Sequence, residues 1–378
     1  MNLPRFRNIT EREYSALASP NVVNLADAHV RWAPSAAEAI VIATLGDAWR
    51  NAAETPYTSL ERMAWSSYAS LARQSILRQY DDGRCFTCYA SSVATDLAAA
   101  ILRDARYTTA FISHPTFDNI PDLFRRRGFR VHSHGEQEWA AGQHPEVGGR
   151  GATVWVIVTP NNPTGVTCNE EAIRQLAKAA RENDACLVFD TSFRLFNGDA
   201  LYDIYSVLEE EDPDWIVLED TGKLFPSLDL KIGGLVVCQR FRDKARLIWS
   251  ELILNVSPVS LAVVARFSTT HANDSGASLR TRVLNNRAIV TDIFKATDTP
   301  LQGESSMPVE MVSIGTHDAD SFTELLADQY SVAVVPASSF FWDAPEHGRH
   351  RIRVALARDP DVLIAGTTRV LDALGHLA

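Results

Sequence analysis

The chain has 378 residues, of which 46% are hydrophobic and 22% charged, and its formal net charge is −11. This composition excludes a disordered, collagen-like or coiled-coil protein, and the negative charge disfavours nucleic acid or an anionic membrane surface as partner. No apolar run approaches the ~18 residues of a membrane span, and no secretory signal is expected. Five cysteines are too sparse for a disulfide scaffold, so we expect a cytoplasmic protein.

The first fifth of the chain has the pattern of helices, and an alternating pattern follows. Apolar residues at helical spacing predict helices over 7–20, 35–52 and 58–78. Short apolar runs then predict buried strands at 85–89, 108–112, 154–158, 186–189, 215–218 and 235–238. An amphipathic helix is predicted over 170–181, between two of these strands. The alternation is typical of a largely parallel sheet covered by helices.

The pattern of predicted elements changes in the last quarter of the chain. Strands are predicted at 309–314, 332–335 and 352–356, and helices at 322–330 and 362–377. We therefore expect three parts: an N-terminal arm and helix over 1–34, a large α/β domain over 35–285, and a small α+β domain over 286–378.

Three predicted strand ends carry polar residues of complementary chemistry. The segment TPNNPTG, which contains Asn162, follows one strand, Asp190 ends the next, and EDTGK, which ends in Lys223, follows a third. Ligands of open α/β sheets bind beyond the carboxyl ends of strands. A pyridoxal 5′-phosphate (PLP) site needs a lysine for a Schiff base and a carboxylate for the pyridinium nitrogen. The sequence therefore predicts a PLP site, and no metal site is expected.

With these motifs in this order, the chain resembles the fold type I PLP-dependent enzymes of the aminotransferase class I/II family. The resemblance implies an aspartate aminotransferase-like fold and a homodimer whose sites lie between subunits. It implies that Lys223 forms the Schiff base, that Asp190 holds the pyridinium nitrogen and that Arg353 binds the substrate α-carboxylate. The other implied cofactor contacts are Asn162 on the ring hydroxyl, Phe117 on the ring face, and Ser91, Ser92 and Lys231 on the phosphate.

Three positions depart from the family pattern. The family tyrosine three residues after Asp190 is replaced by phenylalanine, and Ser192 is expected to substitute for the missing hydroxyl. Asp220 stands where a serine is usual, and Lys231 where an arginine is usual. A carboxylate beside a phosphate is unfavourable without a cation, so we expect Asp220 to face a basic group of the substrate.

These departures resemble a narrower group, the PLP-dependent and O2-dependent L-arginine oxidases and hydroxylases of the enduracididine-pathway type. The matching segments are NLADAH (24–29), HPTFDNI (114–120), TPNNPTG (159–165), DTSFR (190–194), EDTGKL (219–224) and LDLK (228–231). The resemblance implies oxidation of L-arginine to 2-ketoarginine and a 4-hydroxy or 4,5-dehydro product, with release of hydrogen peroxide and ammonia. It also implies that Thr10 and Glu13, on an N-terminal helix that closes over the substrate, bind that substrate, and that His29 is an acid or base.

Other interpretations remain open at this stage. Thr10 and Glu13 have the spacing of a capping box, in which each side chain bonds a free helix N–H group. His29 follows Asp27 and could be a buried structural histidine. A conventional PLP-dependent aminotransferase for a basic amino acid is the second candidate function, and a non-catalytic regulator with a PLP fold is the third.

Overall fold

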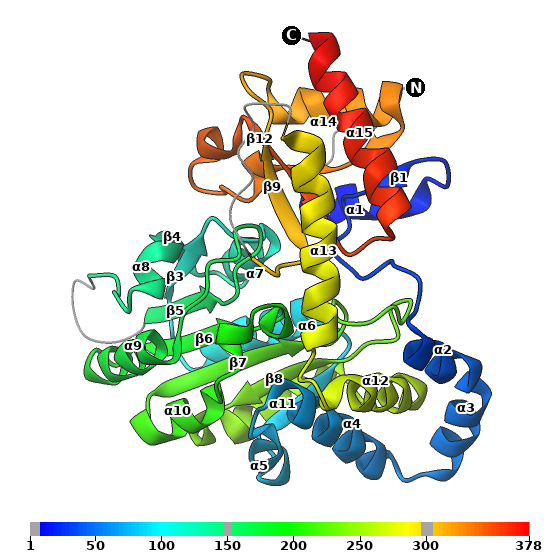
Figure 1. Ribbon diagram of the computed structural model, residues 1–378. Helices are drawn as coiled ribbons and strands as arrows, with labels where there is room; N and C mark the ends of the chain where they lie inside the picture. Colours follow the sequence, from blue (N-terminus) through cyan, green and yellow to red (C-terminus); the bar gives the residue numbers. More distant parts are fainter. Residues whose placement is uncertain (1–7, 147–152, 296–304, 378) are drawn as a thin grey trace.

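The computed structural model describes residues 8–146, 153–295 and 305–377. A seven-stranded sheet forms the large part of the molecule, in the order β2–β8–β7–β6–β5–β3–β4 (Figure 1). Its strands are β2 (Cys85–Cys88), β3 (Thr109–His114), β4 (Arg130–Gly135), β5 (Thr153–Val158), β6 (Cys186–Asp190), β7 (Asp214–Asp220) and β8 (Gly233–Val237). The pairs from β4 to β7 are parallel, and β8 is antiparallel to both β2 and β7. The predicted, largely parallel sheet is confirmed.

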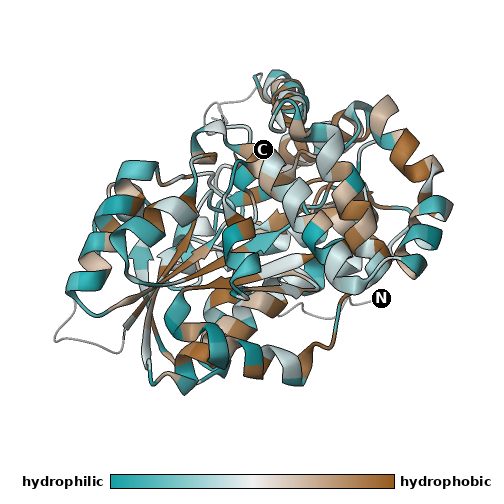
Figure 2. Cartoon of the chain, turned by 90° about the horizontal axis from the view of Figure 1, so that it is seen from below, coloured by the Kyte–Doolittle hydropathy of each residue, from teal (hydrophilic) through white to brown (hydrophobic). Residues whose placement is uncertain are grey.

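The central strands are apolar because helices cover both faces of the sheet. Every residue of β5, β6 and β8 is buried, and Figure 2 shows brown strands between helices with teal outer surfaces. The helices of the large part are α2 (Ala36–Ala43), α3 (Leu45–Glu54), α4 (Tyr57–Ala72), α5 (Ile76–Asp81), α6 (Ser91–Asp104), α7 (Asn119–Arg126), α8 (Glu136–Ala140), α9 (Glu170–Glu182), α10 (Ile204–Glu211), α11 (Arg242–Leu252) and α12 (Pro258–Ala272). No helix in the described ranges has the length and hydrophobicity needed to cross a membrane.

Helix α9 illustrates how the local sequence sets the element bounds. The Asn169 side chain accepts a hydrogen bond from the Ala172 N–H group and so caps the helix. Its buried side chains, Ala172, Ile173, Leu176, Ala177 and Ala180, recur at the spacing of one helical face and pack on the sheet.

A smaller α+β part lies at the top of Figure 1. Strands β11 (Val335–Pro336), β12 (Arg351–Ala355) and β9 (Val309–Ser313) form an antiparallel sheet in that order. Helices α14 (Ala319–Tyr330) and α15 (Pro360–Leu377) belong to this part, as predicted. The N-terminal arm joins it, because β1 (Val23–Asn24) pairs in parallel with β10 (Val332–Ala333). Helix α1 (Ile9–Ala18) buries Ile9 and Ala16 against Val335 and Phe340.

Helix α13 (Ala277–Phe294) connects the two parts and runs without interruption from one into the other (Figure 1). The predicted domain boundary at residue 285 falls inside this helix, so the chain has no break there. The three-part division stays a prediction.

Several predicted elements are divided in the structure. The helix predicted over 35–52 divides at Thr44, and the one over 58–78 divides where Arg73 takes a left-handed conformation. The strand predicted over 332–335 is divided between β10 and β11. Strand β4 had no sequence signal, because it is the edge strand and none of its residues is fully buried.

Candidate active site

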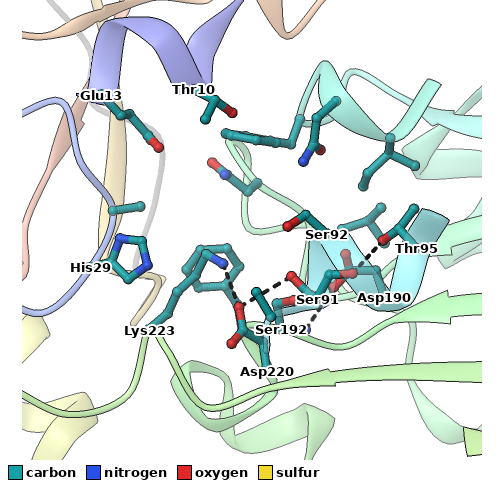
Figure 3. A pocket seen from close by; sticks show the side chains of 18 of the residues that line it. Thr10, Glu13, His29, Ser91, Ser92, Thr95, Asp190, Ser192, Asp220 and Lys223 are labelled. Carbon is teal, nitrogen blue, oxygen red and sulfur yellow. Dashed lines mark hydrogen bonds and ion pairs between the residues drawn. The ribbon is translucent and has the colours of Figure 1, made fainter. Parts of the chain in front are cut away.

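The predicted site residues meet in one cavity beyond the carboxyl ends of β5, β6 and β7 (Figure 3). The cavity encloses about 890 Å³ of empty space, part of which is open solvent. The predicted residues that line it are Thr10, Glu13, His29, Ser91, Ser92, Phe117, Asn162, Asp190, Ser192, Asp220, Lys223 and Lys231. Arg353 is not among the lining residues, because it lies behind Glu13.

Lys223 and Asp220 form an ion pair at the end of β7. The Lys223 Nζ atom lies 3.0 Å from Oδ2 of Asp220, whose Oδ1 accepts a 2.8 Å hydrogen bond from the Gly222 N–H group. Burial alone would lower the pKa of Lys223, but the facing carboxylates, Asp220 first, raise it. Burial likewise opposes ionisation of Asp220, yet Lys223 lowers the pKa of that carboxyl below its usual value. Both groups are therefore charged in the free protein.

The surroundings of Gly222 leave no room for a side chain. A Cβ atom at this position would lie 2.5 Å from Cδ of Lys231, which passes directly over the glycine. The absent side chain therefore leaves room for Lys231 to reach the cavity.

Asp190 ends β6 as a buried carboxylate. Its Oδ1 atom accepts hydrogen bonds from the Ser192 N–H group at 2.9 Å and from the Ser192 hydroxyl at 2.6 Å. Burial raises the pKa of Asp190, and the two hydrogen bonds from Ser192 oppose that shift. A cationic ring nitrogen beside this carboxylate would stabilise its ionised form. Ser192 lines the cavity as predicted, although its hydroxyl is engaged by Asp190.

Two further features of the cavity fit a phosphate and a ring substituent. Helix α6 has Ala90 as its N-cap residue, which has no side-chain acceptor, so the N–H groups of its first turn have no side-chain cap. Such a helix start, beside Ser91 and Ser92, suits a phosphate. The Asn162 amide is buried, and its Oδ1 atom has no hydrogen-bond partner within the described residues. These residues, together with Lys223 and Asp190 in the same cavity, therefore fit PLP.

His29 belongs to a chain of charged groups at the edge of the cavity. Its Nδ1 atom makes a short contact with Oδ1 of Asp27, and Arg31 Nε donates to Oδ2 of the same carboxylate at 2.9 Å. Burial alone would raise the pKa of Asp27, but hydrogen bonding to His29, with nearby arginines, holds it well below its usual range. The ionised carboxylate therefore accepts a hydrogen bond from the Nδ1–H group, and Nε2 lies 3.4 Å from Nζ of Lys231. The histidine lines the cavity and is not a fully buried structural residue.

Helix α1 supplies Thr10 and Glu13 to the side of the cavity away from the sheet (Figure 3). The capping-box interpretation is wrong, because Asn8 caps α1 and its side chain accepts from the Glu11 N–H group. The Glu13 carboxylate instead binds Nη2 of Arg353 at 2.7 Å. Two of the four residues predicted to bind substrate, Glu13 and Arg353, thus bind one another in this structure.

The sequence analysis did not identify several residues of the site. The further lining residues are Ala28, Ala90, Thr95, Asn119, Ile120, Val158 and Phe193. Phe193 stands where the family has tyrosine, and Lys223 Nζ lies 5.3 Å from the centre of its ring. Its position in the DTSFR segment could have identified it.

A buried polar cluster around Glu219 supports the site from below and had no sequence signal. The Glu219 carboxylate is completely buried and accepts hydrogen bonds from Tyr68 at 2.6 Å and from Thr191, Arg194 and Tyr205 at 2.8 Å each. Thr191 and Glu219 adjoin Asp190 and Asp220 respectively, so the cluster fixes both strand ends.

A lysine and a carboxylate at neighbouring strand ends, facing an uncapped helix start, define a fold type I PLP-dependent enzyme. The chain matches the family model of aminotransferase class I and II over residues 67–365, and it belongs to that family. PLP is the cofactor expected of this family. No curated protein sequence matches the chain.

Solved structures agree with this fold. A structure of MppP soaked with the product 2-ketoarginine has a TM-score of 0.87 and 32% identity, covering 93% of this chain and 99% of that one. Aspartate aminotransferase from Thermus thermophilus with maleate has a TM-score of 0.75 and 16% identity, covering 98% of each chain. YbdL from Escherichia coli, described with a methionine aminotransferase function, has a TM-score of 0.72 and 17% identity, covering 98% of this chain and 100% of that one. The last two show the fold alone.

Proposed function

We propose that this enzyme oxidises L-arginine with dioxygen. In the first round, L-arginine, O2 and water give 2-ketoarginine, ammonium and hydrogen peroxide. The observation that carries the proposal is Asp220, a buried carboxylate beside Lys223 where the family has serine, together with Glu13 across the cavity. Carboxylates suit the planar guanidinium of arginine, which they bind through paired hydrogen bonds. The likeness to MppP, solved with 2-ketoarginine, supports the same substrate.

Each site residue has its own role in the first round of oxidation. PLP, when bound, supplies an electron sink for the α-carbon of the amino acid. Lys223 holds the cofactor and takes the α-proton through Nζ, and the Asp190 carboxylate keeps the ring nitrogen protonated. Asp220 and Glu13 bind the guanidinium, while Arg353 takes the α-carboxylate.

His29 acts in a second round of oxidation. When the oxidised substrate is not released after the first round, a second O2 takes two further electrons and two protons, leaves as a second hydrogen peroxide and so desaturates the side chain. Addition of water at C4 and hydrolytic loss of ammonium then give a 4-hydroxy-2-ketoarginine. An imidazole exchanges protons near neutral pH, and Nε2 of His29 faces the cavity while Asp27 holds Nδ1. We assign to His29 the proton transfers of this round.

We further propose that the enzyme is a cytoplasmic homodimer. Large apolar side chains are exposed beside segments that form the site, with Leu228 81% and Leu254 88% exposed. Tyr89, which is half exposed, directly precedes Ala90 of the cavity and donates to the carbonyl group of Asn255. A second copy that covered these residues would complete the surroundings of the cavity, and light scattering tests this. All five cysteines are buried and unpaired, as suits a reducing compartment.

The decisive experiment is an oxygen-electrode trace of the PLP-loaded enzyme with L-arginine, followed by mass spectrometry of the products. We expect oxygen consumption without an added keto acid, and incorporation of label from H2(18)O at C4. The absence of oxygen uptake would reject the proposal.

The second candidate is a conventional aminotransferase for a basic amino acid. It is favoured by the family itself and by the fold shared with aspartate aminotransferase. It would convert arginine only with a keto acid as amino acceptor, at the same rate with or without oxygen.

A further inference from the structure

The contact between Glu13 and Arg353 occupies the group that should receive the substrate α-carboxylate. Glu13 Oε1 lies 2.7 Å from Nη2 of Arg353, and the same nitrogen makes a second, short hydrogen bond to the carbonyl oxygen of Ala26. Arg353 is completely buried, and its Nε and Nη1 atoms have no hydrogen-bond partner in the described part of the chain. Nη2 is thus hydrogen-bonded, whereas Nε and Nη1 have no acceptor within the described residues.

The shape of a guanidinium makes these two uses exclusive. A carboxylate binds it at two points along the Nε–Nη2 edge or the Nη1–Nη2 edge, and both edges include Nη2. The two hydrogens of Nη2 already go to Glu13 and Ala26. A substrate carboxylate can therefore bind at two points only after one of these contacts breaks.

The contact to Ala26 is the more firmly held. The arm that carries it is fixed by Arg358, which donates to the carbonyl groups of Asn24 at 2.7 Å and His29 at 2.8 Å, and also to that of Asp27. The contact to Glu13, by contrast, depends on one side chain of α1, which lines the cavity. Of the two contacts to Nη2, the one to Glu13 is therefore the one that breaks when a substrate carboxylate binds.

A displaced Glu13 needs a new cation. The cavity that it enters contains the carboxylates of Asp190 and Asp220, and its two lysines are already paired, Lys223 with Asp220 and Lys231 with Asp229. An amino acid with an uncharged side chain leaves Glu13 without a partner in a half-buried place, which is costly. An amino acid with a guanidinium brings the cation with it.

We propose that Glu13 occupies Arg353 in place of the substrate α-carboxylate and moves to the cationic end of the substrate when that carboxylate binds. This inference rests on the proposed function and deepens it, because it makes Glu13 a specificity-determining residue. It couples the two ends of the substrate: the carboxylate site opens at low cost only for ligands that carry a distal cation.

The test uses the PLP-loaded enzyme without oxygen and measures binding by calorimetry and by the cofactor absorbance. L-Arginine is compared with L-norleucine, whose side chain is of similar length and uncharged. In Glu13→Gln we expect arginine to bind about tenfold or more weakly and norleucine about tenfold more tightly, since the amide competes less well than a carboxylate for Arg353. Glu11→Gln, which removes an exposed carboxylate from the same helix, is the matched control and should change neither affinity.

The outcomes of this comparison separate the alternatives. Unchanged norleucine binding in Glu13→Gln would leave Glu13 as a simple guanidinium ligand and would overturn the inference. Weaker binding of both ligands would assign Glu13 a structural role and would overturn it too. A lack of oxygen uptake with arginine would reject the proposed function and leave this binding result unaffected.

A second measurement needs no variant. In the wild-type enzyme, n-propylguanidinium should increase the affinity for glycine, because it binds Glu13 and releases Arg353, and glycine should increase the affinity for n-propylguanidinium by the same factor. Independent binding of the two fragments would contradict the coupling.

Discussion

The ammonium group of Lys223 lies 3.0 Å from Oδ2 of Asp220, so the lysine and the carboxylate that replaces the family serine are direct partners. This pair exists only while Lys223 carries its positive charge. If bound cofactor engages Nζ of Lys223, the free ammonium group would no longer be available to Asp220, and this carboxylate could accept the cation of a basic substrate.

Lys223→Ala should abolish the visible absorption band of the lysine-bound cofactor and leave PLP weakly held. The reason is that Lys223 is the lysine at the end of β7 in the cavity. Absorption spectra before and after gel filtration check this. Lys178→Ala, at an exposed position of α9, is the control. An unchanged band in Lys223→Ala would remove the assignment.

Asp220→Asn should weaken L-arginine binding by about 1–3 kcal/mol, the scale of a lost hydrogen bond to a charged group. Norleucine binding should change much less, and the cofactor should stay bound. Calorimetric titration of both ligands measures the difference. Equal losses for the two ligands would show that Asp220 does not recognise the guanidinium.

His29→Ala should alter the products more than the oxygen uptake. Lys223 handles the α-proton, so oxygen consumption and 2-ketoarginine should persist. The hydroxylated and desaturated fraction should fall by about 10²-fold, the weight of a positioned acid or base. Product ratios by mass spectrometry under saturating arginine check this. A wild-type ratio at the wild-type rate would make the histidine structural.

Glu219→Gln should destabilise the fold by about 3–5 kcal/mol, because it leaves the buried charge of Arg194 without its counter-ion. Urea unfolding of the apoprotein measures the change. Glu210→Gln, at an exposed ion pair with Arg174, serves as the control and should cost less than about 1 kcal/mol. A Glu219→Gln protein as stable as the wild type would exclude a supporting role for the cluster.

Glu136 should make stability depend on pH near neutrality. Burial raises the pKa of Glu136 to about 7, although Thr164 and Asn161 donate hydrogen bonds to its carboxyl group. The folded state therefore binds a proton that the unfolded state has lost between about pH 4.5 and 7, so this group's contribution to stability falls as the pH rises through that window. Glu136→Gln should flatten the dependence in urea unfolding at pH 5 and pH 7.5. The same slope in both proteins would contradict the shift.

Local sequence predicted the parts of the site that depend on strand ends. Asn162, Asp190 and Lys223 follow neighbouring parallel strands, and the carboxyl ends of such strands meet at one edge of the sheet. The chain order of these motifs was therefore enough to bring them together.

The side-chain partners across the chain were not predictable in this way. Glu13 and Arg353 are 340 positions apart, and no local pattern shows that one would occupy the other. The spacing of Thr10 and Glu13 even favoured a cap, which Asn8 provides instead. Lys231 was expected at the phosphate, and in the structure it binds Asp229 and lies near His29.

Helix α13 contacts both the cofactor side and the substrate side of the molecule. Near its start, Arg280 holds the carbonyl group of Leu195, which follows the DTSFR segment, at 3.0 Å. Near its middle, Asn286 donates to the carbonyl groups of Leu356 and Arg358, just beyond β12 and Arg353. Arg280 and Asn286 are about 9 Å apart along the helix axis. The loop that carries Ser192 and the strand end that carries Arg353 are therefore both attached to one short stretch of helix, with no flexible linker between the two contacts.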